Sequence, residues 1–193
     1  HLCRRVADTR RLLARLVPAH IELEYQVGEG CSDRTWVALE PGNVDQIVAN
    51  LVLNARDAMP EGGRILVRAL EAESEDGRPG VALFVADEGV GMDEQTRVRV
   101  FEPFFSTKGE HGTGIGLSTV ARVVEAAGGT IRVESAPGEG TTIGIWLPAC
   151  APPDEAGGGT PESDEAGGAS GPRVILVVED EPQVRSFVER ALA

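Results

Sequence analysis

Asp87 stands at the end of an apolar run, Val81–Ala86, that predicts a buried strand, and Gly89 and Gly91 follow it. A carboxylate at a strand end can accept a hydrogen bond from the amino group of a nucleotide base, and glycines let the backbone approach a ligand closely. About twenty residues later a second glycine cluster, residues 112–116, leads into a helical pattern. Amides at a helix N-terminus bind phosphate. Together these stretches predict a purine-nucleotide pocket with a mobile flap between its two halves.

Three short polar side chains, Asn50, Asn54 and Asp57, recur at helical spacing upstream of this pocket. Asn and Asp are poor helix formers, so a merely solvated helix face would favour Lys or Glu instead. The three residues are either a polar edge that bonds a neighbouring loop or a row of oxygen ligands that faces the pocket. In the second case Asn54 would coordinate Mg²⁺ through its carbonyl oxygen.

The predicted flap carries an aromatic cluster, Val100–Phe105, with three of the five phenylalanines of the chain, and Lys108 follows it. Clustered aromatic side chains at a surface form either a small local core or a docking surface for another domain. Lys108 either reaches a terminal phosphate or is an ordinary solvated lysine.

The elements that position these residues follow from hydrophobic periodicity. We expect helices over residues 2–17, 43–58, 93–100 and 117–127, the second with Asn43 as N-cap and Gln46 as its capping-box partner. Strands are expected over residues 21–27, 35–40, 64–70, 81–86, 130–135 and 141–147. The third and fourth strands should be antiparallel neighbours, and the last two should form a hairpin.

The composition changes after residue 148. Residues 149–172 are almost wholly small, Pro or acidic, which predicts a flexible acidic linker without a core. Residues 173–193 then predict one apolar strand, of the kind buried in a parallel sheet, and one helix. Glu179 and Asp180 stand at the carboxyl end of that strand, where they would either contribute to a Mg²⁺ site or simply begin the helix.

Composition argues against several functional classes. The net charge of −13 disfavours a nucleic-acid or anionic-membrane partner. No apolar run approaches the ~20 residues that a membrane helix needs, and no signal peptide is visible. The three scattered cysteines suggest neither a metal site nor a disulfide framework. We therefore expect a reducing, cytoplasmic compartment, with any membrane anchor of a longer protein lying upstream.

In order along the chain, these motifs resemble those of the ATP-binding catalytic domain of sensor histidine kinases, in the GHKL superfamily. DQIVANLVLNARDAMPEGG resembles the asparagine box, DEGVGM the first glycine box, FEPFFSTK the phenylalanine box and GTGIGLSTV the second glycine box. The resemblance covers about residues 20–148. Residues 173–189 resemble the first strand and helix of a response-regulator receiver domain, with Glu179 and Asp180 as its acidic pair, as in hybrid kinases.

The resemblance implies an α+β fold, the two-layer sandwich of the Bergerat type, in which helices cover one face of a mixed, mostly antiparallel sheet. The implied domains are a catalytic domain over 1–148 with a lead-in helix over 1–18, a linker over 149–172, and the truncated start of a flavodoxin-like receiver over 173–193.

The resemblance also implies ATP and Mg²⁺ as cofactors, with ATP lying between the helices and the flap. Asp87 would receive the adenine amino group, Asn54 would hold Mg²⁺, and Asn50 and Lys108 would act at the phosphates as catalytic residues. The implied ATP-binding residues are Asn50, Asn54, Asp57, Asp87, Gly89, Gly91, Met92, Lys108, Gly112, Thr113, Gly114, Ile115, Gly116, Leu117 and Thr141.

The implied activity is that of a protein histidine kinase, which transfers the γ-phosphate of Mg-ATP to a histidine on a dimerising helical hairpin in a two-component phosphorelay. His1, His20 and His111 do not lie in the family's histidine-acidic pattern. We therefore expect the hairpin to precede residue 1, the isolated chain to lack autophosphorylation, and the hairpin and a receiver domain or response regulator to be the partners.

Two alternatives remain open at this point. The chain could be a GHKL ATPase that hydrolyses ATP with water, but those enzymes carry a glutamate where Asn50 stands. It could also be a nucleotide-binding module without catalysis, although Asn54, Asp87 and the glycines of the second cluster are all present.

Overall fold

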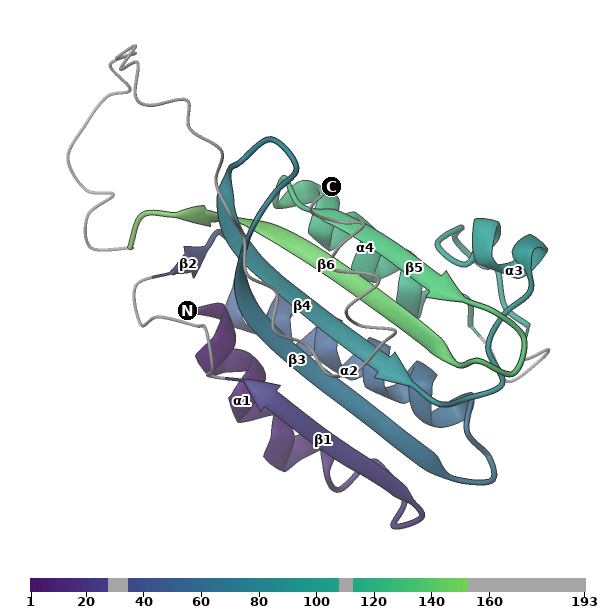
Figure 1. Ribbon diagram of the computed structural model, residues 1–193. Coiled ribbons are helices and arrows are strands. Elements are labelled where there is room, and N and C mark those ends of the chain that lie inside the picture. The colour runs from purple at the N-terminus through teal and green to yellow at the C-terminus, as the bar shows by residue number, and fades with distance from the viewer. Residues whose placement is uncertain (28–34, 108–112, 153–193) are drawn as a thin grey trace.

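The computed structural model describes residues 1–27, 35–107 and 113–152. These residues form two layers, a six-stranded sheet and a layer of helices on one face of it (Figure 1). The strand order is β1-β3-β4-β6-β2, and β5 pairs with β6. Because β1 runs parallel to β3 and the other pairs are antiparallel, the sheet is mixed. The expected α+β sandwich is therefore confirmed.

The strands lie where the hydrophobic pattern of the sequence predicted them, with some differences in length. They are β1 Ile21–Val27, β2 Trp36–Val37, β3 Gly63–Glu73, β4 Pro79–Asp87, β5 Thr130–Ser135 and β6 Thr141–Cys150. The β3–β4 connection is shorter than the expected polar loop over 71–80, because antiparallel pairing continues to Glu73 and Pro79. The β5–β6 hairpin is confirmed.

The helices are α1 Leu2–Leu13, α2 Pro41–Asp57, α3 Glu94–Arg99 and α4 Gly116–Ala126. Asn43 was wrongly predicted as the N-cap of α2: the helix begins at Pro41, with Glu40 as N-cap. Proline suits the first helical position, since its fixed φ is helical and its missing N–H would have no partner there. The apolar stripe of α2, including Val48 and Leu51, is buried as expected.

The strand register decides which face carries the functional side chains. Asp87 pairs with Ile65 on one side and with Thr141 on the other. Ile65 is completely buried in the core that the helices share with the sheet. Because register partners project to the same face, Asp87 and Thr141 also lie on the helix-covered face. Asp87 is the last residue of β4 and Thr141 is the first residue of β6. Both therefore lie next to the loops that follow α2 and β4.

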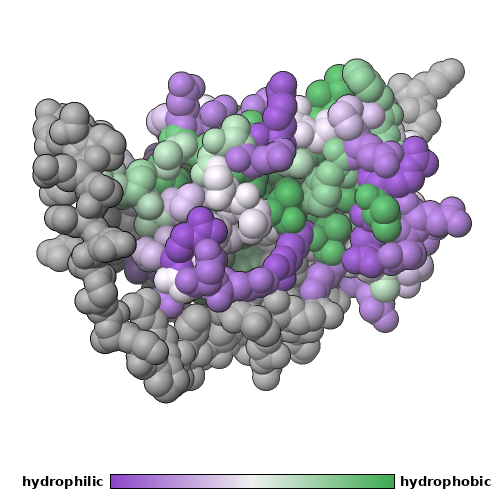
Figure 2. Space-filling view, turned by 90° about the horizontal axis from the view of Figure 1, so that it is seen from above, coloured by the Kyte–Doolittle hydropathy of each residue, from purple (hydrophilic) through white to green (hydrophobic). Residues whose placement is uncertain are grey.

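Within the described ranges, no helix is long and apolar enough to cross a membrane. The surface seen from above mixes polar and apolar patches (Figure 2). The sequence suggested no disulfide framework, but Cys3 takes part in a disulfide, whereas Cys150 is free and exposed. The linker was predicted to begin at residue 149, but β6 continues to Cys150, because Ala149 and Cys150 pair with β2. Residues 153–172 of the predicted linker and the receiver-like strand and helix, with Glu179 and Asp180, lie outside the described residues.

Candidate functional site

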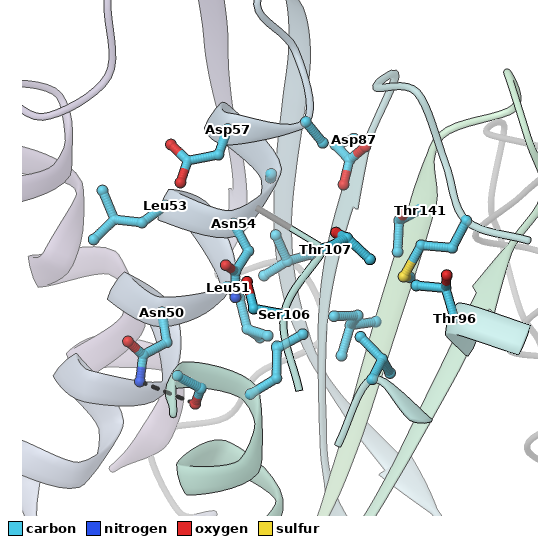
Figure 3. A pocket seen from close by; sticks show the side chains of 18 of the residues that line it. Asn50, Leu51, Leu53, Asn54, Asp57, Asp87, Thr96, Ser106, Thr107 and Thr141 are labelled. Atoms are coloured by element: carbon cyan, nitrogen blue, oxygen red, sulfur yellow. Dashed lines mark hydrogen bonds between the residues drawn. The ribbon is translucent and has the colours of Figure 1, made fainter. Parts of the chain in front are cut away.

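A cavity of about 390 Å³ lies between α2, the adjacent ends of β4 and β6, the flap and the start of α4 (Figure 3). Most of the predicted site residues that the structure describes line it: Asn50, Asn54, Asp57, Asp87, Gly91, Met92, Thr113, Gly114, Gly116, Leu117 and Thr141. Gly89 and Ile115 are not in its lining. Lys108 and Gly112 lie outside the described residues. Residues from four separate stretches of sequence thus meet around one cavity.

The helix side of the cavity is formed by the polar row on α2. Asn50 Nδ2 donates a hydrogen bond to the backbone oxygen of Gly116, at 3.3 Å (Figure 3). A Cβ atom on Gly116 would lie 3.5 Å from Asn50 Oδ1 and 3.8 Å from Asn54 Nδ2. The first turn of α4 therefore packs directly against the two asparagines. Asn50 combines both roles left open by its spacing, since it lines the cavity and also bonds a neighbouring backbone group.

Asp57 is the outermost member of the polar row. Its Oδ1 lies 2.6 Å from Nη2 of Arg56, and its side chain points away from Asp87 (Figure 3). This carboxylate is therefore partly neutralised by a cation at the rim of the cavity.

Asp87 is the buried carboxylate on the strand side, with an exposed fraction of 7%. It accepts a hydrogen bond from the Gly89 N–H, at 2.9 Å, and another from the backbone of Thr141. Burial raises the pKa of Asp87 to about 6, although these two bonds act in the opposite direction. A Cβ atom on Gly89 would lie 2.8 Å from Asp87 Oδ1 and 2.7 Å from the Ala58 oxygen, so a larger residue would displace the carboxylate.

The loop after Asp87 is held between α2 and the β5–β6 hairpin. The Val90 N–H donates to the Ala58 oxygen at 3.0 Å, and the Gly138 N–H donates to the Val90 oxygen at 2.8 Å. Gly91 has a φ of +66°, and a Cβ atom there would collide with the Ala136 oxygen. Glycine is therefore required at this position by both conformation and space.

The aromatic cluster of the flap divides into inward and outward residues. Phe105 and Val100 both line the cavity, and Val100 is buried. Phe104 is 79% exposed and has a φ of +65°, which is unusual for a bulky side chain. Its N–H donates to the Gly114 oxygen at 2.9 Å and so joins the flap to the second glycine cluster. The cluster is thus partly a local core and partly free apolar surface.

Sequence reasoning did not assign three cavity hydroxyls, those of Thr96, Ser106 and Thr107. Ser106 and Thr107 directly follow the aromatic cluster and precede the second glycine cluster in the sequence. This position between two motifs was the available signal. In the described part of the chain, no group of three or more His, Cys, Asp or Glu side chains forms a metal site. A cation in this cavity would need ligands from a bound anion as well as from the protein.

The raised pKa of Asp87 predicts a pH-dependent stability. A buried carboxyl group of this kind contributes its full stability below its unfolded pKa of 3.8 and loses it as the pH rises through about 6. Asp87→Asn should therefore raise the unfolding free energy of the ligand-free chain at pH 8, by up to about 3 kcal/mol, and much less at pH 4. Urea titrations at both pH values measure this difference.

The matched control for this experiment is Glu88→Gln, because Glu88 is the exposed neighbouring carboxylate. The unfolding free energy of Glu88→Gln should equal that of the wild type at both pH values. Identical pH dependence in wild type and Asp87→Asn would show that Asp87 is ionised without cost in the folded chain.

Comparison with known proteins gives three kinds of match. The model of the family described as histidine kinase-, DNA gyrase B-, and HSP90-like ATPase matches residues 40–151. The sensor kinase CckA of Brucella abortus (strain 2308) is 38% identical over 203 residues, which cover 97% of this chain and 21% of that protein. The chain thus spans about a fifth of the length of this relative.

Two solved structures share the fold. The mycobacterial sensor histidine kinase MprB superposes with a TM-score of 0.61 at 30% identity, over 77% of this chain and 94% of that chain. Full-length ShkA, solved in complex with AMPPNP, superposes with a TM-score of 0.64 at 27% identity, over 79% of this chain and 31% of that chain.

Proposed function

Because this chain belongs to the family of histidine kinase-, DNA gyrase B-, and HSP90-like ATPases, we propose that it binds Mg-ATP and donates the γ-phosphate to a histidine of a helical hairpin domain. The observation that carries the proposal is that the two ends of the cavity carry different polar groups. A buried carboxylate, Asp87, lies at one end, and two asparagines and the N-terminus of α4 lie at the other. The homology to sensor histidine kinases and the AMPPNP bound to ShkA support the same ligand.

At the base end, Asp87 would accept a hydrogen bond from the amino group of adenine. The carboxylate is already oriented by the Gly89 and Thr141 N–H groups, so little ordering is needed on binding. Gly91 and Met92 would lie along the edge of the base, since both line the cavity.

At the phosphate end, Gly116 and Leu117 begin α4 and line the cavity. The unpaired N–H groups and the dipole at a helix N-terminus favour an anion. Thr113 and Gly114 extend this surface toward the flap. Lys108 and Gly112 would complete it, although they lie outside the described residues.

The cavity fits Mg²⁺ only together with the phosphates. The described residues offer no cluster of acidic ligands, and Mg²⁺ commonly uses one protein oxygen, waters and substrate phosphates. We assign the Asn54 carbonyl oxygen as the protein ligand, because Asn54 lines the cavity beside the start of α4. When bound, the ion would neutralise phosphate charge.

The proposed partners follow from the histidine kinase relatives. The phosphate acceptor would be a histidine of a hairpin outside this chain. The match with CckA covers 97% of this chain and so extends into residues 173–193. From their resemblance to the first strand and helix of a receiver, we propose that these residues begin a receiver domain, with Glu179 and Asp180 as its acidic pair.

The metal assignment predicts a selective loss of affinity. Asn54→Ala should weaken Mg-ATP by at least about tenfold and adenosine only slightly, because only the phosphates use the ion. Isothermal titration with Mg-ATP, ATP in excess EDTA, and adenosine measures the three affinities. The matched control is Asn43→Ala, on the same helix but absent from the cavity lining. An equal loss for adenosine and Mg-ATP would mean that Asn54 acts structurally.

The proposed function itself is tested by the wild-type titrations. Tight binding of Mg-ATP with a clear loss in EDTA is expected. Absence of nucleotide binding would refute it.

A further inference from the structure

The hydroxyl group of Ser135, at the end of β5, has three hydrogen-bonding neighbours. Ser135 Oγ accepts from the Met92 N–H at 2.8 Å, and it lies 2.8 Å from the Gly140 oxygen and 3.0 Å from Thr141 Oγ1. This one atom therefore connects the first glycine box, the hairpin loop and the first residue of β6. Ser135 does not line the cavity, whereas Thr141 does.

The protons of this cluster can be assigned from donor and acceptor capacity. Ser135 has one hydroxyl proton, and a carbonyl oxygen can only accept. If Ser135 donates to the Gly140 oxygen, the Thr141 hydroxyl must donate to Ser135, and every neighbour of Ser135 is then satisfied. If Ser135 donated to Thr141 instead, the carbonyl of the buried Gly140 would lose this donor, which is costly. The first arrangement is therefore favoured.

This arrangement decides that the Thr141 hydroxyl acts as an acceptor, and not as a donor, toward the cavity. Its proton is committed to Ser135, so Thr141 Oγ1 presents only lone pairs to a ligand. Thr141 is the register partner of Asp87 on the same face, and both line the cavity. The base end of the cavity thus offers two neighbouring acceptors and calls for a group with two N–H donors.

We propose that Ser135 is a positioning residue for base selection: it holds the Thr141 hydroxyl as an acceptor, so that Thr141 and Asp87 together receive both N–H bonds of the 6-amino group of adenine. The proposal rests on the proposed function, since it requires a purine nucleotide in this cavity. In Ser135→Ala the Thr141 hydroxyl is free to rotate and can turn its proton toward the ligand. The site then no longer requires two donors.

The test compares ATP with purine riboside 5′-triphosphate, which lacks only the 6-amino group. Isothermal titration of the full chain measures the affinities for both nucleotides. The ratio of the ATP affinity to the purine riboside triphosphate affinity gives the contribution of the amino group to binding. We expect this ratio to fall about three- to tenfold in Ser135→Ala, the range for a neutral hydrogen bond, and to be preserved in Ser135→Thr, which keeps the hydroxyl. An equal loss of affinity for both nucleotides in Ser135→Ala would mean that Ser135 only supports the loop, and would overturn the proposal.

A second variant keeps the proposal testable if Ser135→Ala folds poorly. Thr141→Val removes the acceptor and leaves Ser135 bonded to Met92 and Gly140, so the ratio should fall by a similar factor. Adding Ser135→Ala to Thr141→Val should then leave the ratio unchanged, because the two residues act through one hydroxyl. A further fall in the double variant would contradict the mechanism. Failure of the wild-type chain to bind ATP would instead refute the proposed function, and this inference with it.

Discussion

Replacing Asp87 by alanine should weaken the binding of ATP and ADP alike by roughly ten- to hundredfold. A hydrogen bond to a charged group contributes about 1.5–3 kcal/mol, and Asp87 is the buried carboxylate among the described residues that line the cavity. ATP and ADP should lose the same factor, because they differ only at the γ-phosphate, which would lie at the other end. Isothermal titration with both nucleotides measures the two losses.

The same assignment predicts discrimination against GTP. Guanine carries an oxygen at its six-position, and this acceptor would face the Asp87 carboxylate. Glu88→Ala is the control for the alanine series, since Glu88 is exposed and pairs with Arg64 on the surface. That variant should bind ATP as the wild type does. Equal affinity of the wild-type chain for ATP and GTP would rule out Asp87 as the group that reads the base.

The arrangement around Asp87 was largely predictable because it depends on regular elements. The continuous apolar run that ends in Asp87 predicts a buried strand, and alternation predicts the hairpin strand that begins at Thr141. The antiparallel β4–β6 pairing, which the sequence did not predict, then places the two side chains together. The second glycine cluster is likewise followed by a strongly amphipathic helix, α4, whose start meets α2.

Other features depend on tertiary contacts and were not readable. Ser135 looks like an ordinary strand residue, and only the return of the chain at Met92 and Gly140 gives its hydroxyl three neighbours. The division of the aromatic cluster into Phe105 inside and Phe104 outside depends on the left-handed conformation of Phe104. At the start of α2, Asn43 was expected to be the N-cap, yet Pro41 is the first helical residue.

The contacts of Asn50 explain why the cavity should be slow to hydrolyse ATP. Its Nδ2 donates to the Gly116 oxygen, so the amide holds α4 in place, and an amide has no useful basicity near neutral pH. The carboxylates among the described lining residues are Asp57, paired with Arg56, and Asp87 at the base end. Water attack on the γ-phosphate would therefore lack a general base there, whose help is typically worth roughly 10²–10⁴-fold in rate.

A kinase benefits from slow hydrolysis, since bound ATP must survive until the acceptor imidazole arrives. A neutral imidazole is itself a nucleophile and needs mainly in-line positioning. In the proposed transfer, a bond would form between an imidazole nitrogen and the γ-phosphorus while the bond to the bridging oxygen breaks. ADP would leave, and the other imidazole nitrogen would release its proton to solvent. Phe104 and Val98 are exposed and would offer apolar surface to the incoming domain of the proposed function.

We therefore expect this chain to bind Mg-ATP, to hydrolyse it very slowly, and to remain unlabelled by γ-³²P-ATP. Adding the histidine-bearing hairpin of a related kinase, in cis or in trans, should give an acid-labile, alkali-stable phosphohistidine on the hairpin. Asn50→Glu should raise hydrolysis only modestly, because the new carboxylate would face the Gly116 carbonyl without a tuned environment and the bond that holds α4 would be lost. Rapid ATP turnover by the unmodified chain would favour a water-hydrolysing ATPase instead, and labelling at His1, His20 or His111 would place the acceptor within this chain.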